Sequence, residues 1–168
     1  MSADSPGRAA NLENWQTTFA AAFVYPTRVR FQDVDAAKVV FFPRVLEYFH
    51  DAYVAFLDER RLGLPELLAK GEWGLPIRHA EADYMAPLRF GDAIEVAIVA
   101  KAIEEHGFSL CYRVVRMDAG GPVVAALGET RHVAISVGDG RPRRRPLPPE
   151  VAAALAVVPE RPASVSVG

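Results

Sequence analysis

The hydrophobic and polar positions divide the chain into one helical stretch and a longer region of strands. Residues 25–31 alternate between polar residues and β-branched or aromatic ones, which predicts a strand. Between residues 43 and 62 apolar side chains recur at helical spacing, which predicts an amphipathic helix that ends at Gly63. One strand and then one long helix are therefore expected early in the folded region. The apolar stripe of this helix consists of Val45, Phe49, Ala52, Tyr53 and Phe56.

The second half of the chain changes to the period of two that is typical of strands. Polar and apolar residues alternate through most of residues 94–136. Turn-forming residues at 91–92, 106–107 and 118–121 divide this region into about four antiparallel strands. A shorter helix is expected over residues 65–70. This order predicts an α+β domain in which one long helix packs on an antiparallel sheet of about five strands.

The same pattern suggests three segments along the chain. Residues 1–12 are mostly small and polar and show no apolar period, so we expect a flexible tail there. Residues 13–138 hold the predicted helices and strands and are expected to form the folded domain. Residues 139–168 are rich in proline and arginine and end in an alanine-rich stretch that is compatible with a short helix. The length of 168 residues fits one such domain.

Composition narrows the class of protein without indicating a function. The chain is 51% hydrophobic and 24% charged, as in globular proteins and unlike disordered ones. Its longest apolar run, residues 151–158, is far shorter than a membrane-spanning helix, and its first residues do not resemble a secretory signal. Cys111 is the only cysteine, which excludes an internal disulfide and a cysteine metal cluster. We therefore expect a cytoplasmic protein with no membrane partner.

The charge balance argues against nucleic acid as a partner. The chain has 19 lysines and arginines against 21 aspartates and glutamates, for a formal net charge of −2. Proteins that bind nucleic acid are usually strongly basic, because they neutralise phosphates. Function must therefore be sought in local groups of residues.

The loop before the long helix carries two carboxylates, at Asp33 and Asp35. One interpretation is structural: either aspartate can cap the helix or lie in solvent. The other is functional: a carboxylate beside a helix start can act on an electrophilic carbonyl while unpaired backbone N–H groups stabilise the oxyanion. The pattern alone leaves both interpretations open.

Residues 33–43, DVDAAKVVFFP, resemble the signature of the hotdog-fold acyl-CoA thioesterases of the 4-hydroxybenzoyl-CoA thioesterase type. That signature reads Asp-x-Asp-x-x-Gly-x-Val followed by two aromatic residues. The resemblance continues through residues 82–92, ADYMAPLRFGD, and residues 130–134, TRHVA, and it covers roughly residues 25–150. It implies a hotdog fold, in which the sheet wraps around one long helix. It also implies a homodimer or homotetramer whose sites take residues from two subunits.

The resemblance implies an acyl-CoA substrate and a site without cofactor or metal. Asp35 matches the catalytic carboxylate, which serves as nucleophile or as general base toward water, and Phe42 supplies the backbone N–H that polarises the thioester carbonyl. Lys38 stands where the family has glycine. If the backbone there needs positive φ, lysine is less favourable than glycine. Lys38 either lies exposed on an altered turn or binds near the phosphates of the substrate.

Aromatic residues around the loop and helix favour an aromatic or bulky acyl group, although the same residues can simply fill the core. Phe41 and Tyr53 are assigned to substrate binding on this ground. His50 lies in a sequence similar to that of relatives acting on 1,4-dihydroxy-2-naphthoyl-CoA. It would then bind a hydroxyl or carbonyl of an aromatic acyl group; the alternative is a core histidine with one hydrogen bond.

Two further groups of charged residues have structural alternatives. Alternation places His79, Glu81 and Asp83 on one strand face, which is either solvated or a polar subunit interface. The arginine cluster either lies in solvent or receives the phosphates of coenzyme A, which suit arginine geometrically. Its members are Arg141, Arg143, Arg144 and Arg145.

Two rival functions remain open at this point. A hotdog hydratase or dehydratase would need a histidine and a carboxylate at the acyl chain, and residues 33–43 contain no histidine. A non-catalytic module that binds acyl-CoA or an acyl-carrier protein is compatible with Lys38 at the usual glycine position.

Overall fold

The structure, a computed structural model, describes residues 22–63, 65, 69, 71, 73–137 and 141–156. The tail expected over residues 1–12 lies outside the described residues, as does most of the helix expected over 65–70. No helix in the described part of the chain is long and apolar enough to cross a membrane.

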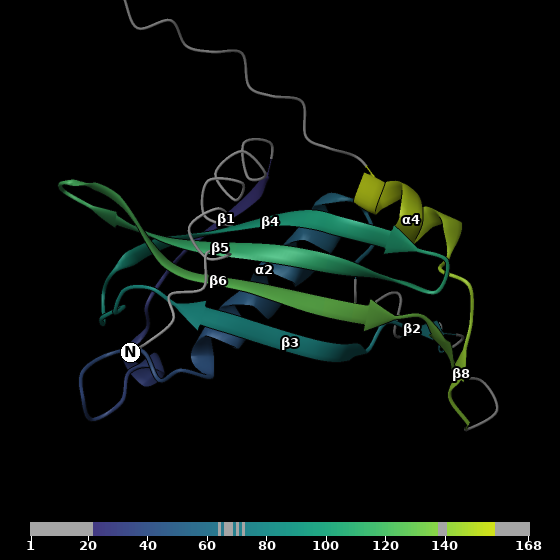
Figure 1. The fold of residues 1–168 in the computed structure, drawn as a ribbon, viewed down its shortest axis with the longest axis horizontal. Helices are drawn as coiled ribbons and strands as arrows, with labels where there is room; N and C mark the ends of the chain where they lie inside the picture. The colour runs from purple at the N-terminus through teal and green to yellow at the C-terminus, as the bar shows by residue number, and fades with distance from the viewer. Residues whose placement is uncertain are drawn as a thin grey trace, which may run out of the picture.

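The fold is a five-stranded antiparallel sheet with one long helix across one of its faces (Figure 1). The helix is α2 (Arg44–Glu59), and the strand order in the sheet is β1-β4-β5-β6-β3. This arrangement confirms the predicted α+β class, the single long helix and the five strands. The strands are β1 (Phe23–Arg28), β3 (Ile77–Tyr84), β4 (Ala93–Glu104), β5 (Gly107–Asp118) and β6 (Gly121–Val133).

The predicted bounds of the first strand and of the helix need correction. The first strand covers Phe23–Arg28 instead of residues 25–31, because the chain turns into the short 3-10 helix η2 (Phe31–Asp33). The helix begins after Pro43, which occupies its N-cap position. It ends before residue 62 because Arg61 adopts a positive φ of 58°, which a helix cannot continue.

A small second sheet forms at the end of the main one and includes part of the arginine-rich segment. Its strand order is β2-β7-β8, and the pattern of the sequence did not indicate it. Helix α4 (Pro149–Ala156) follows and lies beside β4 (Figure 1). Its buried residues Val151 and Leu155 belong to the main core. Residues 141–156 are thus packed onto the domain. The strands of the small sheet are β2 (Trp73–Gly74), β7 (Ile135–Ser136) and β8 (Arg143–Arg144).

The buried face of α2 packs on the inner face of the main sheet and fixes the helix there. All five residues of the predicted apolar stripe are buried, as are Tyr48 and Leu57. Phe49 stacks on Tyr112 of β5 with ring centroids 4.5 Å apart, and it lies directly over Gly128 of β6, where a Cβ atom would clash with its ring. Burying one such aromatic side chain stabilises the fold by about 1.5–3 kcal/mol. The packing therefore fixes the start of α2 relative to the loop before it.

Candidate functional site

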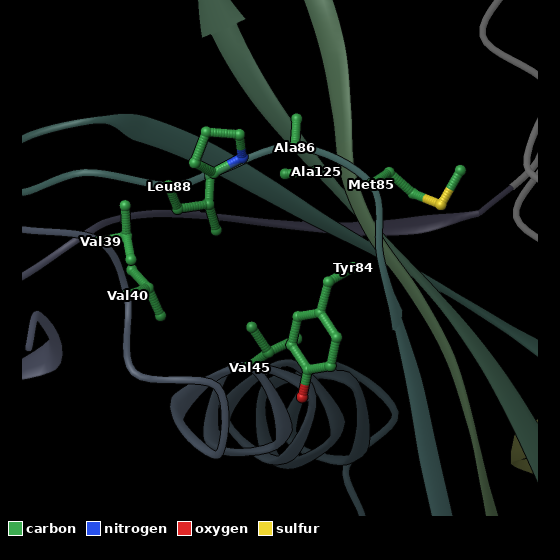
Figure 2. A pocket seen from close by; sticks show the side chains of 9 residues that line it. Val39, Val40, Val45, Tyr84, Met85, Ala86, Leu88 and Ala125 are labelled. Carbon is green, nitrogen blue, oxygen red and sulfur yellow. The ribbon is translucent and has the colours of Figure 1, made fainter. Parts of the chain in front are cut away.

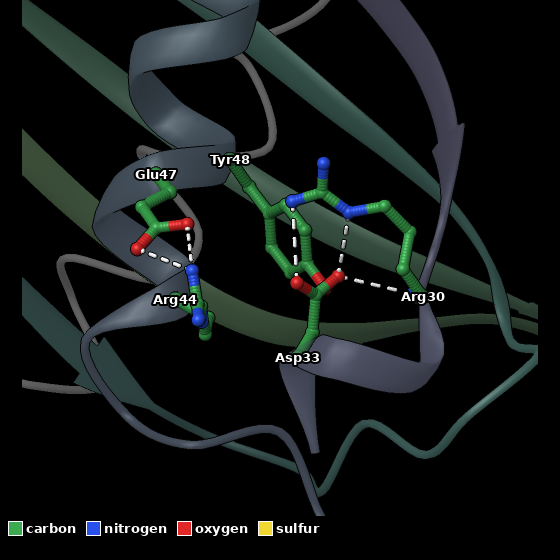
Figure 3. A network of polar contacts seen from close by, with 5 residues as sticks. All are labelled: Arg30, Asp33, Arg44, Glu47 and Tyr48. Atoms are coloured by element: carbon green, nitrogen blue, oxygen red, sulfur yellow. Dashed lines mark hydrogen bonds and ion pairs between the residues drawn. The ribbon is translucent and has the colours of Figure 1, made fainter.

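Asp33, in the loop between β1 and α2, is completely buried. Its carboxylate accepts hydrogen bonds from the backbone N–H and the Nε of Arg30, both at 3.0 Å, and from the Tyr48 hydroxyl at 2.8 Å (Figure 3). Burial by itself raises the pKa of Asp33, but these hydrogen bonds outweigh burial and hold the pKa below its usual value. Asp33 therefore stays ionised and joins the end of β1 to α2. Its role is structural, and it caps η2, not α2.

Asp35, two residues later, is exposed and sits in a tight turn. Its Oδ1 atom accepts the backbone N–H of Ala37 at 2.8 Å, and its carbonyl accepts the N–H of Lys38 at 3.0 Å. No other hydrogen bond to its carboxylate occurs among the described residues. A bridge between Val34 and Val40 closes the turn. One oxygen of the carboxylate is thus fixed by the turn, and the other accepts no hydrogen bond from the described residues.

Lys38 adopts the left-handed backbone conformation that favours glycine, with φ of 62°. Glycine takes this conformation without strain, whereas a residue with a Cβ atom loses about 1–2 kcal/mol. The turn adopts the left-handed conformation with a lysine at the position where the signature that residues 33–43 resemble has glycine. Lys38 therefore strains the loop while its N–H donates to the carbonyl of Asp35.

The start of α2 presents an unpaired backbone N–H at Phe42. The carbonyl of Phe41 accepts the N–H of Arg44 at 2.8 Å, as in the first turn of a helix. Because the peptide unit is trans and planar, the N–H of Phe42 points the opposite way, out of the helix start. It has no acceptor among the described residues. The N–H of Phe41 donates to the carbonyl of Asp33 at 2.9 Å, which brings the two ends of the loop together.

One cavity lies on each side of this loop. One is a cleft of about 580 Å³ lined by Asp35 and Lys38 and by two exposed rings, Phe31 and Phe90, which meet edge to face at 5.8 Å. The other is an apolar cavity of about 290 Å³ beside Val40 (Figure 2). The loop therefore has on one side a cleft with two charged residues and two aromatic rings, and on the other side a cavity lined mainly by aliphatic residues.

The predicted substrate-binding residues fall into two groups. The structure brings Lys38 into the same cleft as Asp35, and it places Phe41 edge to face with Phe42 at 5.1 Å, both partly exposed. His50 and Tyr53 lie further along α2 and line neither cavity. The His50 side chain is exposed, whereas Tyr53 is buried.

Tyr53 is unusual because its buried hydroxyl has no hydrogen-bond partner in the described structure. Burial raises the pKa of this hydroxyl, so it stays protonated. Its ring centroid lies 4.8 Å from that of His132, which belongs to a row of buried polar side chains on β5 and β6. In this row, hydrogen bonds of 3.0 Å join the Tyr112 hydroxyl to Thr130 Oγ1 and Thr130 Oγ1 to His132 Nε2. Burial lowers the pKa of His132 to about 4, so the imidazole is neutral at physiological pH.

Sequence reasoning missed two contacts that shape this site. One is the ion pair of Asp33 with Arg30, to which the Tyr48 hydroxyl adds a hydrogen bond. The sequence contained a signal for this contact, because Tyr48 places a hydroxyl between Val45 and Ala52 on the buried face of the helix. The other is a hydrogen bond at 2.9 Å from the Tyr84 hydroxyl to the carbonyl of Phe42, which joins residues distant in sequence. No spacing rule indicates that second contact.

The charged residues singled out on β3 lie on an exposed strand at the edge of the sheet. His79 Nε2 pairs with Glu81 at 3.1 Å, and both side chains are exposed. The described residues contain no group of three side chains suited to a metal ion. In β8, Arg143 and Arg144 are exposed.

Comparison with known proteins bears on this geometry. Residues 29–155 match the thioesterase-like superfamily. A 1,4-dihydroxy-2-naphthoyl-CoA hydrolase from Nostoc punctiforme is 33% identical over 130 residues, which cover 77% of this chain and 84% of the relative. The crystal structure of a 1,4-dihydroxy-2-naphthoyl-CoA thioesterase from Synechocystis is similar, with a TM-score of 0.73 and 29% identity, covering 80% of this chain and 95% of that one. A gentisyl-coenzyme A thioesterase has a TM-score of 0.68 and 30% identity, covering 80% of this chain and all of the other. The chain therefore belongs to the thioesterase-like superfamily, which confirms the resemblance seen in the loop and the prediction of a thioester hydrolase.

Proposed function

We propose that this protein hydrolyses an aromatic or bulky acyl-CoA thioester to the free acid and coenzyme A. The observation that carries the proposal is that one loop holds an exposed carboxylate, Asp35, and a helix-start N–H, that of Phe42, which has no acceptor among the described residues. The preference for an aromatic acyl group is supported by the relatives, whose names refer to 1,4-dihydroxy-2-naphthoyl-CoA and gentisyl-coenzyme A.

The chemistry needs only these groups. The N–H of Phe42, at the positive end of α2, stabilises the negative charge that develops on the thioester oxygen. Asp35 either attacks the carbonyl carbon, giving a mixed anhydride that water then hydrolyses, or takes a proton from the attacking water. In both routes the bond from carbon to sulfur breaks and coenzyme A leaves as a thiolate that is then protonated. No cofactor takes part in either route.

The remaining predicted site residues are proposed to bind the substrate. Lys38 lies in the Asp35 cleft, where its ammonium group attracts the phosphates of coenzyme A. Phe41 offers a partly exposed ring at the helix start, suited to an aromatic acyl group. His50 and Tyr53 offer an exposed imidazole and an unpaired hydroxyl to polar substituents on that group. They lie outside both cavities, so their contribution depends on how the substrate lies along α2.

We also propose that the protein is a homodimer or homotetramer in the cytoplasm, with its site at a subunit interface. The outer edge of β3 supports this, because no described strand pairs with it and an exposed strand edge readily pairs with another chain. Exposed apolar side chains beside it and at the helix start would be covered by a partner. They include Phe41, Phe42, Leu46, Tyr84 and Met85.

Purified wild type and Asp35→Asn, compared over aromatic and aliphatic acyl-CoAs with thiol release as the readout, test this function. We expect Asp35→Asn to lower kcat by about 10²-fold or more, because the amide is a poor nucleophile and base. Asp58→Asn changes an exposed aspartate at the far end of α2 and serves as the matched control, with wild-type kinetics expected. Equal turnover by wild type and Asp35→Asn would remove Asp35 from the mechanism. Measurable binding without turnover by wild type would favour the acyl-CoA binding module that Lys38 makes conceivable.

A further inference from the structure

We propose that Tyr84 is a positioning residue for the backbone N–H of Phe42, an inference that rests on the oxyanion role proposed above. Tyr84 is the last residue of β3, and its hydroxyl donates a hydrogen bond to the carbonyl oxygen of Phe42 at 2.9 Å. Within the described part of the chain, no other side chain donates to the backbone of residues 41–43. This contact therefore adds a hydrogen bond between the sheet and the start of α2 to the apolar packing of the helix on the sheet.

The helix start depends on such a contact because it lacks the usual cap. Pro43 occupies the N-cap position and its side chain accepts no hydrogen bond. The carbonyl of Phe42 receives the N–H of Val45 at 3.3 Å, which is long for a hydrogen bond of this type. The Tyr84 hydroxyl is the closer of its two partners. Without that hydroxyl, the first turn would be held at Phe42 only by the long bond.

The peptide unit that carries the Phe42 N–H is fixed at its own carbonyl, which accepts the N–H of Arg44 at 2.8 Å, and also on either side of it. On its N-terminal side, the N–H of Phe41 donates to the carbonyl of Asp33, whose side chain is buried and ion-paired. On its C-terminal side, Tyr84 holds the carbonyl of Phe42. Because these anchors come from separate elements, the direction of the Phe42 N–H is set before a substrate binds. An oxyanion donor is effective when it is oriented in this way in advance.

A second role for Tyr84 is to line a cavity with its ring, and experiment can separate this role from the positioning of Phe42. It lines the apolar cavity of about 290 Å³ together with Val39 and Val45, and Figure 2 shows its hydroxyl directed toward the start of α2. If the residue served only as a cavity wall, the ring would matter and the hydroxyl would not. If it positions Phe42, the hydroxyl matters by itself.

Tyr84→Phe and Tyr84→Leu distinguish these two roles, with benzoyl-CoA as substrate and thiol release as the readout. We expect Tyr84→Phe to lower kcat about tenfold at an unchanged KM, less than the roughly 10²–10³-fold lost when an oxyanion donor itself is removed. Tyr84→Leu removes the ring as well and should also raise KM. The matched control is Tyr25→Phe, which removes a hydroxyl from a half-buried tyrosine of β1 and should leave kcat and KM unchanged.

Hydrogen exchange of the Val45 amide provides a second readout that needs no turnover. We expect faster exchange in Tyr84→Phe, because the helix start loses its anchor, and wild-type exchange in Tyr25→Phe. Unchanged exchange, or wild-type kcat in Tyr84→Phe, would overturn the positioning role. If the wild type hydrolyses no aromatic acyl-CoA while the Val45 amide still responds as expected, the proposed function fails and the anchor stands.

Discussion

Asp33 and Asp35 are two carboxylates on one loop, separated by a single residue, and the fold places them in opposite environments. Asp33 is buried, accepts hydrogen bonds from two side chains and has a lowered pKa. Asp35 is exposed, and its carboxylate accepts one backbone N–H from its own turn. A carboxylate whose lone pairs are occupied stabilises structure, whereas one with a free oxygen at a cleft can attack or deprotonate. The first aspartate therefore supports the loop that presents the second.

The same substitution at the two aspartates should affect stability very differently. Asp33→Asn should lower the free energy of unfolding by about 2 kcal/mol, because charge-assisted hydrogen bonds to a buried group are lost. Asp35→Asn should change it by less than about 0.5 kcal/mol, as exposed substitutions usually do. Urea unfolding of both variants measures the difference. Equal losses of stability would show that the two environments do not differ as described.

Substitution of Tyr48 tests whether its hydroxyl helps to hold the Asp33 carboxylate in place. Tyr48→Phe keeps the ring in the core and removes only the hydrogen bond to the carboxylate. We expect a loss of about 1 kcal/mol in the free energy of unfolding, read from the same urea titration. Tyr25→Phe is the control. An equal loss in the free energy of unfolding in both variants would contradict a specific contribution of the Tyr48 hydroxyl.

Substitutions of Lys38 test whether its positive φ strains the loop beside Asp35. Lys38→Gly should raise the free energy of unfolding by about 0.5–1 kcal/mol, because glycine adopts the positive φ without strain but is more flexible when unfolded. Lys38→Ala keeps the strain and removes the same ammonium group, so it should not stabilise the protein. A shared loss of substrate affinity in the two variants would support binding by Lys38, whereas wild-type KM in both would remove that role.

The contribution of Asp33 to stability should also depend on pH. The pKa of Asp33 is lower in the folded state than in the unfolded chain, where aspartate titrates near about 3.9. Its contribution is therefore complete above that pH and is lost as the pH falls toward the folded pKa. The stability difference between wild type and Asp33→Asn should be constant from about pH 5 to 7 and shrink below pH 4. Chemical unfolding at several pH values measures this, and a difference that grows in acid would contradict it.

Much of the fold could be predicted from the sequence, because its elements have clear periods. The apolar stripe of α2 from Val45 to Phe56 is buried as the helical spacing indicated, and the alternating stretches form the long strands. The small sheet was missed because its strands, such as β8, have only two residues and show no period. The ends of the helix were misplaced, because Pro43 and Arg61 set them through backbone geometry.

The candidate site was predictable only in part. The motif in residues 33–43 indicated Asp35, Lys38 and Phe42, and the family assignment agrees with that motif. It could not indicate which aspartate is buried, because that depends on Arg30 and Tyr48 meeting Asp33 after the helix has packed.

The sequence by itself determined the class of fold, the apolar face of the helix and the loop that carries the candidate chemistry. These follow from local periodicity and from a short motif, which neighbouring residues define. Only the tertiary structure decided that Asp33 is an anchor, that Lys38 lies in the Asp35 cleft and that Tyr84 reaches Phe42. Such contacts join residues that are distant along the chain or face different neighbours, and they exist only once the helix lies on the sheet.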